Sequence, residues 1–185
     1  MLERLMAMEP AQRPVPQQVL SIDPGQTNVA MCFTDDEHNS THTSKIALPE
    51  EIKLSALKFV YLEQVIEQWL RMFRPQFVVK EAPALGASHG VADAGRFQYI
   101  VERLCFEHGV ALMTVQNSSM RKFIGASGGE HSKSDVKLRV WQKYEKEFDS
   151  EDECDAFAIG RVGLAILAGT YDVVKGTRKR VKRGA

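Results

Sequence analysis

Short apolar runs that stop abruptly at an acidic residue characterise the first part of the chain. Val19-Leu20-Ser21-Ile22 ends at Asp23, and a Pro-Gly turn signal follows at once. Val29 to Phe33 is apolar again, and a weaker alternating run extends from His42 to Ala47. These patterns predict three antiparallel strands, at about 18–23, 29–34 and 42–47.

Further along, helical periodicity alternates with short strands. Apolar residues recur at three- and four-residue spacing from Leu54 to Phe73, which predicts an amphipathic helix that begins at Pro49 and ends at Arg74-Pro75. Other helices are predicted at about 91–108, 117–124, 134–148 and 151–169, and strands at 77–81 and 110–115. An antiparallel meander followed by α-linked strands predicts an α/β fold with a mixed five-stranded sheet flanked by helices.

Length and composition narrow the class of protein. The 185 residues, 44% hydrophobic and 26% charged, suit one domain with a sizeable core, predicted over 18–170 after a disordered or loosely docked arm at 1–17. The sequence has no apolar run of the roughly 18 residues that span a membrane and no signal-peptide pattern, so we expect an intracellular protein. Cys32, Cys105 and Cys154 are predicted to be buried thiols rather than zinc ligands or disulfides.

Charge is distributed unevenly although the net charge is zero. Residues 171–185 form a basic tail, in which six Lys and Arg residues fall between Lys175 and Ala185 without an acid. The remainder therefore holds 18 basic against 24 acidic residues, a balance of −6. This asymmetry is typical of a protein that contacts a polyanion, and equally of a solvated terminus.

Four carboxylates stand out by position. Asp23 and Glu81 each end a predicted strand, and Asp152 and Asp155 lie on one face of the last helix. Converging carboxylates repel one another unless a cation shares the site, and hard oxygen ligands favour Mg²⁺ or Mn²⁺. Two such ions are a standard device for phosphodiester hydrolysis, so the four positions predict a metal-dependent nuclease site.

A purely structural explanation covers part of this pattern. Ser150 and Glu153 form a capping box, and acids in a first helical turn are favoured by the helix dipole, which explains Asp152 without catalysis. Asp155 lies beyond that turn beside apolar residues, and Glu81 directly follows the apolar run Phe77-Val78-Val79. A carboxylate in such surroundings needs a partner, which favours the catalytic interpretation of the set.

These same residues resemble a known family. Ile22-Asp23-Pro24-Gly25 is similar to the opening strand and turn of the RuvC Holliday junction resolvases, and Asp152 to Ile159 resembles their closing Asp-x-x-Asp-Ala helix. Glu81 matches their central glutamate, and the Gly-rich loop before Ser132-Lys133-Ser134 resembles the segment in which a lysine supports the DNA. The resemblance covers about residues 18–168.

The resemblance implies a ribonuclease H-like fold and a homodimer that nicks four-way DNA junctions as a Mg²⁺- or Mn²⁺-dependent crossover junction endodeoxyribonuclease, with two ions per site. It implies metal ligation by Asp23, Glu81, Asp152 and Asp155, and a phosphate contact by the catalytic Lys133. We expect no small-molecule substrate and no membrane partner. The residues expected to contact DNA are Lys133, Lys137, Arg121, Lys122, Arg178, Lys179, Arg180, Lys182 and Arg183. The chain departs from the bacterial pattern after Glu81, where Ala82 to Gly86 contains no aromatic residue.

Three other hypotheses remain open at this point. One is a different ribonuclease H-like nuclease that cuts flaps or RNA–DNA hybrids. Another is a nucleotide-binding module like the actin-like ATPases, against which stand the length of 185 residues and the lack of a second Gly-rich phosphate loop. The third is a non-catalytic junction-binding scaffold, against which stands the presence of all four acids.

Overall fold

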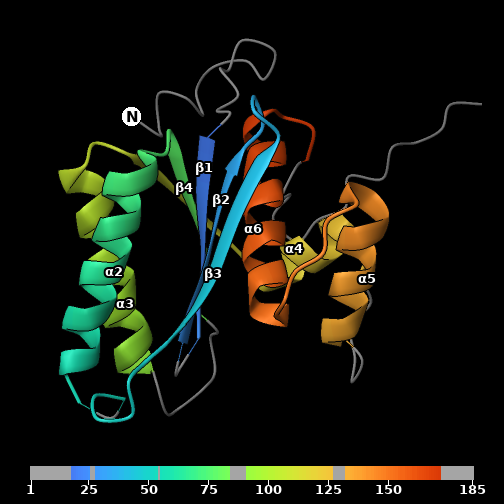
Figure 1. Cartoon of the computed structure of the whole chain (residues 1–185). Helices are drawn as coiled ribbons and strands as arrows, with labels where there is room; N and C mark the ends of the chain where they lie inside the picture. The colour runs from blue at the N-terminus through green and yellow to red at the C-terminus, as the bar shows by residue number, and fades with distance from the viewer. Residues whose placement is uncertain (1–17, 26–27, 54, 84–90, 127–131, 172–185) are drawn as a thin grey trace, which may run out of the picture.

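The computed structural model describes residues 18–25, 28–53, 55–83, 91–126 and 132–171, and it contains one five-stranded mixed sheet (Figure 1). The strands are β1 (Gln18–Pro24), β2 (Asn28–Asp35), β3 (Ser40–Ala47), β4 (Phe77–Glu81) and β5 (Ala111–Val115). Their order is β3-β2-β1-β4-β5. β1, β2 and β3 pair antiparallel, whereas β4 joins β1, and β5 joins β4, in parallel. The predicted fold class is confirmed.

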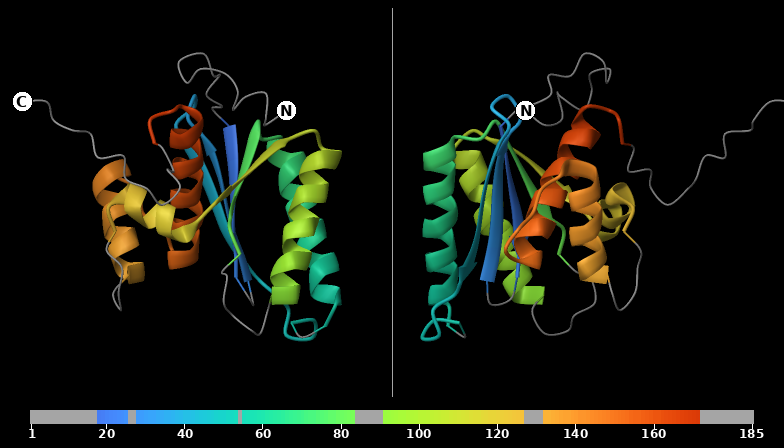
Figure 2. Two further views of the ribbon diagram at one scale, coloured as in Figure 1. Left: turned by 180° about the vertical axis from the view of Figure 1, so that it is seen from behind. Right: turned by 45° about the vertical axis from the view of Figure 1, so that its right-hand side comes forward.

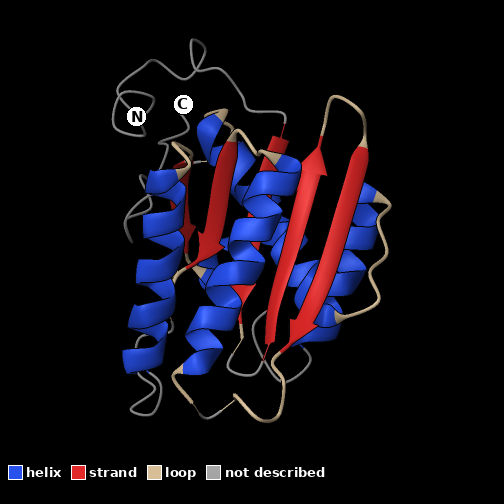
Figure 3. Ribbon diagram, turned by 60° about the vertical axis from the view of Figure 1, so that its left-hand side comes forward, coloured by secondary structure: helices blue, strands red, loops and turns tan. Residues whose placement is uncertain are grey.

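Helices cover both faces of this sheet. They are α2 (Leu57–Phe73), α3 (Val91–Glu107), α4 (Asn117–Ile124), α5 (Ser132–Tyr144) and α6 (Glu151–Leu167). α2 and α3 lie on one face, and α6 lies on the other with α4 and α5 beyond it (Figure 2). Figure 3 shows the two long strands of the β2–β3 hairpin next to each other, with the face of the hairpin toward the viewer. None of the helices within the described ranges is long and apolar enough to cross a membrane.

Strand alternation assigns each side chain of β1 to one of two cores. Leu20 and Ile22 belong to the core beneath α2 and α3, whereas Val19 belongs to the core beneath α6. Ser21 also faces α6, because a Cβ added at Gly160 of that helix would lie 2.9 Å from Ser21 Oγ. Since successive side chains point to opposite faces, Asp23 continues the row that faces α6.

α6 packs almost without a gap on the centre of the sheet. A Cβ at Gly163 would lie 2.4 Å from Val79 Cγ2 of β4, so only glycine permits this approach. Residues Glu153 to Gly160 of the helix are buried. The predicted capping box at its start is confirmed, with the Glu153 amide donating to Ser150 Oγ at 3.2 Å and the Ser150 amide donating to Glu153 Oε2 at 3.0 Å.

Two predicted helix boundaries are wrong. The first helix begins at Leu57 instead of Pro49, because Pro49 and the residues after it form turns and the Ser55 hydroxyl accepts from the Leu57 amide. Leu57 is consequently 60% exposed. The helix predicted to reach Phe148 ends at Tyr144, where Glu145 adopts a left-handed φ of 54° and turns the chain toward α6.

The thiols behave as predicted, since all three cysteines are free and buried. The N-terminal arm predicted at 1–17 lies outside the described residues, and so does the predicted basic tail beyond Tyr171. Those two predictions therefore remain predictions.

Candidate active site

Asp23 and Glu81 end neighbouring strands on the same face of the sheet. The last register pair recorded between β1 and β4 is Ile22 with Lys80, and the two acids are the next residue on each strand. Glu81 continues the row of Phe77 and Val79, which face α6 as Asp23 does. The parallel pairing thus places both carboxyl groups side by side at the C-terminal edge of these strands.

α6 carries the other two carboxylates to this edge. The helix runs antiparallel to β1 (Figure 1), with Gly160 over Ser21 and Gly163 over Val79. Asp155 precedes Gly160 by five residues, about 7.5 Å of helix, and Asp23 follows Ser21 by two residues, about 6.6 Å of strand. Asp155 therefore reaches the level of Asp23, and it is only 6% exposed.

The electrostatics of Asp23 indicate that the four groups gather. Burial, a side-chain hydrogen bond with Glu81 and repulsion from Glu81, Asp155 and Asp152, in that order, raise the pKa of Asp23 from 3.8 to about 9. Asp23 is therefore protonated at neutral pH, and its proton allows the hydrogen bond with Glu81. A raised pKa of this origin is typical of a functional carboxylate cluster.

Polar side chains hold the two outer carboxylates. Asp152 Oδ2 accepts from Lys45 Nζ at 2.7 Å and from Asn28 Nδ2 at 3.0 Å. Glu81 Oε1 accepts from Asn117 Nδ2 at 2.7 Å, and Asn117 Oδ1 accepts from Arg121 Nε at 2.7 Å. Asp152 and Glu81 are thus oriented by neutral or cationic donors.

Sequence reasoning missed three of these partners, Asn28, Lys45 and Asn117. Asn28 and Lys45 become neighbours of Asp152 through the register of the hairpin, in which Asp23 pairs with Ala30 and Ala30 with Lys45. The turn at Asp35–Ser40 sets the hairpin register, and that register could have identified Lys45 as a neighbour of the carboxylates. The sequence predicts Asn117 only as the start of the helix at 117–124, whereas in the structure Gln116 is the N-cap residue and the Asn117 side chain donates to Glu81.

The donor set fits a hard divalent cation, although its geometry is not that of a closed metal site. Within the described ranges, no three His, Cys, Asp or Glu side chains are close enough together to enclose one ion. Asp152 is directed to Lys45 and Glu81 to Asn117, so these two carboxylates bond to protein donors at the edges of the site. Four carboxylates at one strand edge still offer the oxygen ligands that Mg²⁺ and Mn²⁺ prefer.

Among the residues predicted to contact DNA, the structure connects Arg121 to the carboxylate site. Arg121 is linked to Glu81 through Asn117, and Lys122 is exposed on the same helix. Lys137 of α5 lines a hollow of about 260 Å³ together with Trp141 and Lys146. Lys133 lies in the first turn of α5, but its side chain is outside the described part of the structure. The predicted tail residues, Arg178, Lys179, Arg180, Lys182 and Arg183, also lie outside it.

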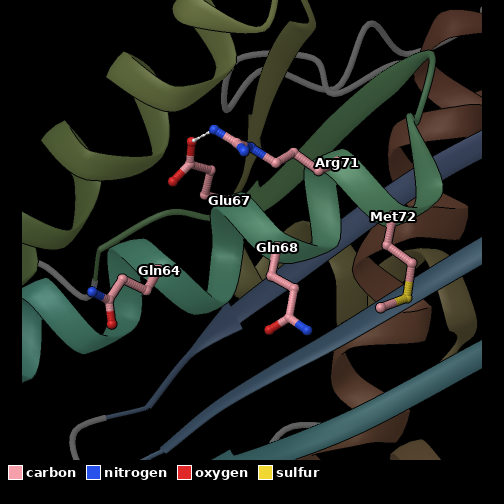
Figure 4. A pocket seen from close by; sticks show the side chains of 5 residues that line it. All are labelled: Gln64, Glu67, Gln68, Arg71 and Met72. Atoms are coloured by element: carbon pink, nitrogen blue, oxygen red, sulfur yellow. Dashed lines mark hydrogen bonds and ion pairs between the residues drawn. The ribbon is translucent and has the colours of Figure 1, made fainter.

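A second hollow lies on the other side of the molecule. It has a volume of about 480 Å³ and is formed by one outer stretch of α2, from Gln64 to Met72 (Figure 4). Arg71 Nη2 donates to Glu67 Oε1 there at 2.6 Å. Because α2 covers the sheet face opposite α6, this hollow is not part of the carboxylate site.

Comparisons with known proteins identify the fold. A scan against family models finds no match, and no curated protein matches the sequence. The structure is similar to RuvC of T. thermophilus, both in complex with a Holliday junction substrate (TM-score 0.67) and in a second structure (0.66), each at 18% identity over 83% of this chain and 97% of that one.

A fowlpox virus resolvase solved with Holliday junction DNA is also similar, with a TM-score of 0.53 and 15% identity over 81% of this chain and 98% of that one. The chain therefore has the RuvC-type, ribonuclease H-like fold that its sequence predicted.

Proposed function

We propose that this protein is a divalent-metal-dependent endonuclease that resolves four-way DNA junctions. The observation that carries the proposal is the gathering of Asp23, Glu81, Asp152 and Asp155 at one strand edge, with the pKa of Asp23 raised to about 9 by burial and its neighbours. Such a cluster costs the fold stability, and arrangements of this kind are typical of functional sites. The likeness to junction-bound resolvases supports the choice of substrate.

Each residue of the cluster has a separate task in this proposal. Asp23, Glu81, Asp152 and Asp155 would hold two Mg²⁺ or Mn²⁺ ions, which when bound supply activation of water and stabilisation of charge on the phosphate. Asn117 fixes the orientation of Glu81 through its 2.7 Å hydrogen bond. The proton on Asp23 has to leave before that carboxylate can ligate a cation.

The surrounding cations would hold the DNA. Arg121, Lys122, Lys137 and Lys133 come from α4 and α5, which lie beside α6 on the cluster side of the sheet. Lys133 is proposed to contact the phosphate near the site, and the basic tail after residue 170 to contact a junction arm. Contacts of this kind raise affinity and its salt dependence without selecting a sequence.

We also propose that the protein is a homodimer whose two active sites cut opposed strands of the junction. We propose that it acts inside the cell, where DNA is present. Large apolar side chains exposed on α2 and α3 support self-association: Phe106 is 86% exposed, Tyr99 63% and Met72 61%. Contiguous exposed apolar patches often mark an interface, and Tyr99 and Phe106 lie two turns apart on one face of α3. Light scattering of the wild type and of Phe106→Ser tests this, and a monomeric wild type would contradict it.

The decisive experiment is cleavage of a labelled, immobile four-way junction in Mg²⁺ or Mn²⁺. The wild type is expected to give paired symmetric nicks, and Asp155→Asn none while still binding the junction. Duplex, flap and RNA–DNA hybrid substrates of equal length serve as controls. If a flap or a hybrid is cut while the junction is not, the proposed substrate is wrong. If the junction is bound but not cut in either metal, the protein is a junction-binding scaffold and not a nuclease.

A further inference from the structure

Lys45 occupies the same row of the sheet as the carboxylate cluster. It pairs with Ala30 across β2 and β3, and Ala30 pairs with Asp23 across β1 and β2. Paired residues on neighbouring strands point to the same face. The side chain of Lys45 therefore projects on the α6 side, two strands away from Asp23.

Its ammonium group meets the cluster at Asp152. Lys45 Nζ lies 2.7 Å from Asp152 Oδ2, and the same oxygen accepts from Asn28 Nδ2 at 3.0 Å. The Lys45 side chain is 40% exposed and that of Asp152 21%. The ammonium group thus lies at the rim of the site, between one ligand candidate and the solvent from which DNA would approach.

A cation at this position changes what the cluster can bind. Four carboxylates attract a divalent ion strongly, and a lysine paired with one of them offsets part of that attraction. Lys45 and Asn28 both bind Asp152 Oδ2, which is one of the two oxygens that a metal ion could use. Lys45 and a metal ion therefore compete for the same carboxylate.

We propose that Lys45 is an exchangeable counter-ion of the site: it neutralises Asp152 in the metal-free protein, is displaced when a divalent ion binds, and then contacts the phosphodiester. This inference rests on the proposed metal-dependent function and adds a substrate-contacting residue to it. A lysine is suited to the exchange because its stem is flexible and its ammonium group forms no fixed bidentate geometry.

The inference predicts two effects of opposite direction for Lys45→Met in the full-length protein. Removal of the competing charge should lower the dissociation constant for Mn²⁺, measured by calorimetry after EDTA treatment, by about fivefold at low salt. Junction cleavage at saturating Mn²⁺ should nevertheless become slower by about tenfold, because the phosphate loses its ammonium partner. Lys45→Arg, which retains the charge, should have a dissociation constant for Mn²⁺ close to that of the wild type.

Arg161→Met is the matched control. Arg161 also joins α6 to the β2–β3 hairpin, with its Nη1 2.6 Å from Asp36 Oδ1, but it does so at the opposite end of β2 from Asn28. This variant removes one positive charge and one ion pair between the same two elements. It should leave both the Mn²⁺ affinity and the cleavage rate unchanged. In an Asp152→Asn background, Lys45→Met should lose most of its effect on Mn²⁺ affinity.

The outcomes separate this inference from the function on which it rests. If the wild type binds Mn²⁺ and Lys45→Met binds it equally well or more weakly, Lys45 does not compete with the metal ion, and the proposal of a counter-ion is wrong. The proposed metal site is not contradicted by that result. Tighter Mn²⁺ binding with unchanged cleavage overturns the phosphate contact. Absence of Mn²⁺ binding by the wild type overturns the metal site and the exchange together. A purely structural role for Lys45 would instead lower the melting temperature and weaken Mn²⁺ binding.

Discussion

Replacement of Asp23 by asparagine should stabilise the metal-free protein while it abolishes metal binding. The side chain keeps its size and its ability to hydrogen bond with Glu81, but it can no longer ionise. The wild-type carboxyl group has a folded-state pKa of about 9 against 3.8 ordinarily, because burial and its acidic neighbours disfavour the charge. The folded protein therefore retains a proton that the unfolded chain releases above pH 4.

The sign and size of the effect follow from this difference. Between the two pKa values, each pH unit lowers the free energy of unfolding of the wild type by about 1.4 kcal/mol. The ceiling at pH 7 is then about 4 kcal/mol, and because four coupled carboxylates share the repulsion we expect about 2 kcal/mol for Asp23→Asn. For a chain of this length, that raises the melting temperature by about 4–8 °C.

Thermal unfolding in EDTA at a series of pH values measures this gain. The advantage of Asp23→Asn should grow as the pH rises from 4 toward 9. It should nearly vanish at about pH 4, where the unfolded wild-type chain also begins to take up the proton that the folded protein keeps. Added Mn²⁺ should reverse the order, since it stabilises only the wild type. Asp149→Asn, at an exposed position just before α6, is the control and should shift stability by less than about 0.5 kcal/mol.

Two results would refute this reasoning. A wild type as stable as Asp23→Asn at pH 7 in EDTA would mean that neither burial nor the neighbouring carboxylates disfavour the charge on Asp23 in the folded protein. A stability difference that persists at pH 4 would mean that the substitution acts through packing instead of charge.

Three further substitutions test the packing around the site. Ser150→Ala removes the capping box with Glu153 and should lower the free energy of unfolding by about 1 kcal/mol in urea titrations. Gly163→Ala places a Cβ 2.4 Å from Val79 Cγ2 and should lower the free energy of unfolding by about 2 kcal/mol. Cleavage should be lost because α6 moves away from the sheet. An unchanged free energy of unfolding would mean that the helix lies farther from the sheet. Lys80→Met replaces a buried ammonium group that lies 3.6 Å from Glu102 Oε1 but has no hydrogen-bond partner among the described residues, and whose pKa is lowered, chiefly by burial. It should stabilise by about 1 kcal/mol at neutral pH. The gain should shrink as the pH rises toward 10.5, because the wild type then folds with an uncharged amine at this position; a gain that grows with pH would contradict this.

Local pattern is sufficient to predict much of the fold. The alternation of β1 places Val19 and Asp23 on one face, and the abrupt ends of two apolar runs place Asp23 and Glu81 at strand ends. The capping box at Ser150 and the burial of the thiols are also predicted correctly. These features depend on residues close together in the chain, so periodicity and turn chemistry carry them.

Competition among local signals explains the wrong boundaries. Pro49 and the acids after it are a good helix start by rule, yet the turn closed by Ser55 wins and the helix begins at Leu57. The apolar stripe continues through Leu57 in the sequence, while the structure exposes that residue. Periodicity indicates which residues share a helix face, but it does not say where the sheet beneath that face ends.

The partners of the carboxylates were decided only by the tertiary structure. The proximity of Asp23 to Glu81 follows from the parallel pairing of β1 with β4, and the contact of Lys45 with Asp152 follows from two hairpin registers and the docking of α6. Lys45 and Asp152 are far apart in the chain, and no periodic pattern relates them. The sequence alone determined which residues could carry the chemistry, because charge and strand position are local properties. The fold decided which of them meet, because pairing and packing are settled by the whole chain at once.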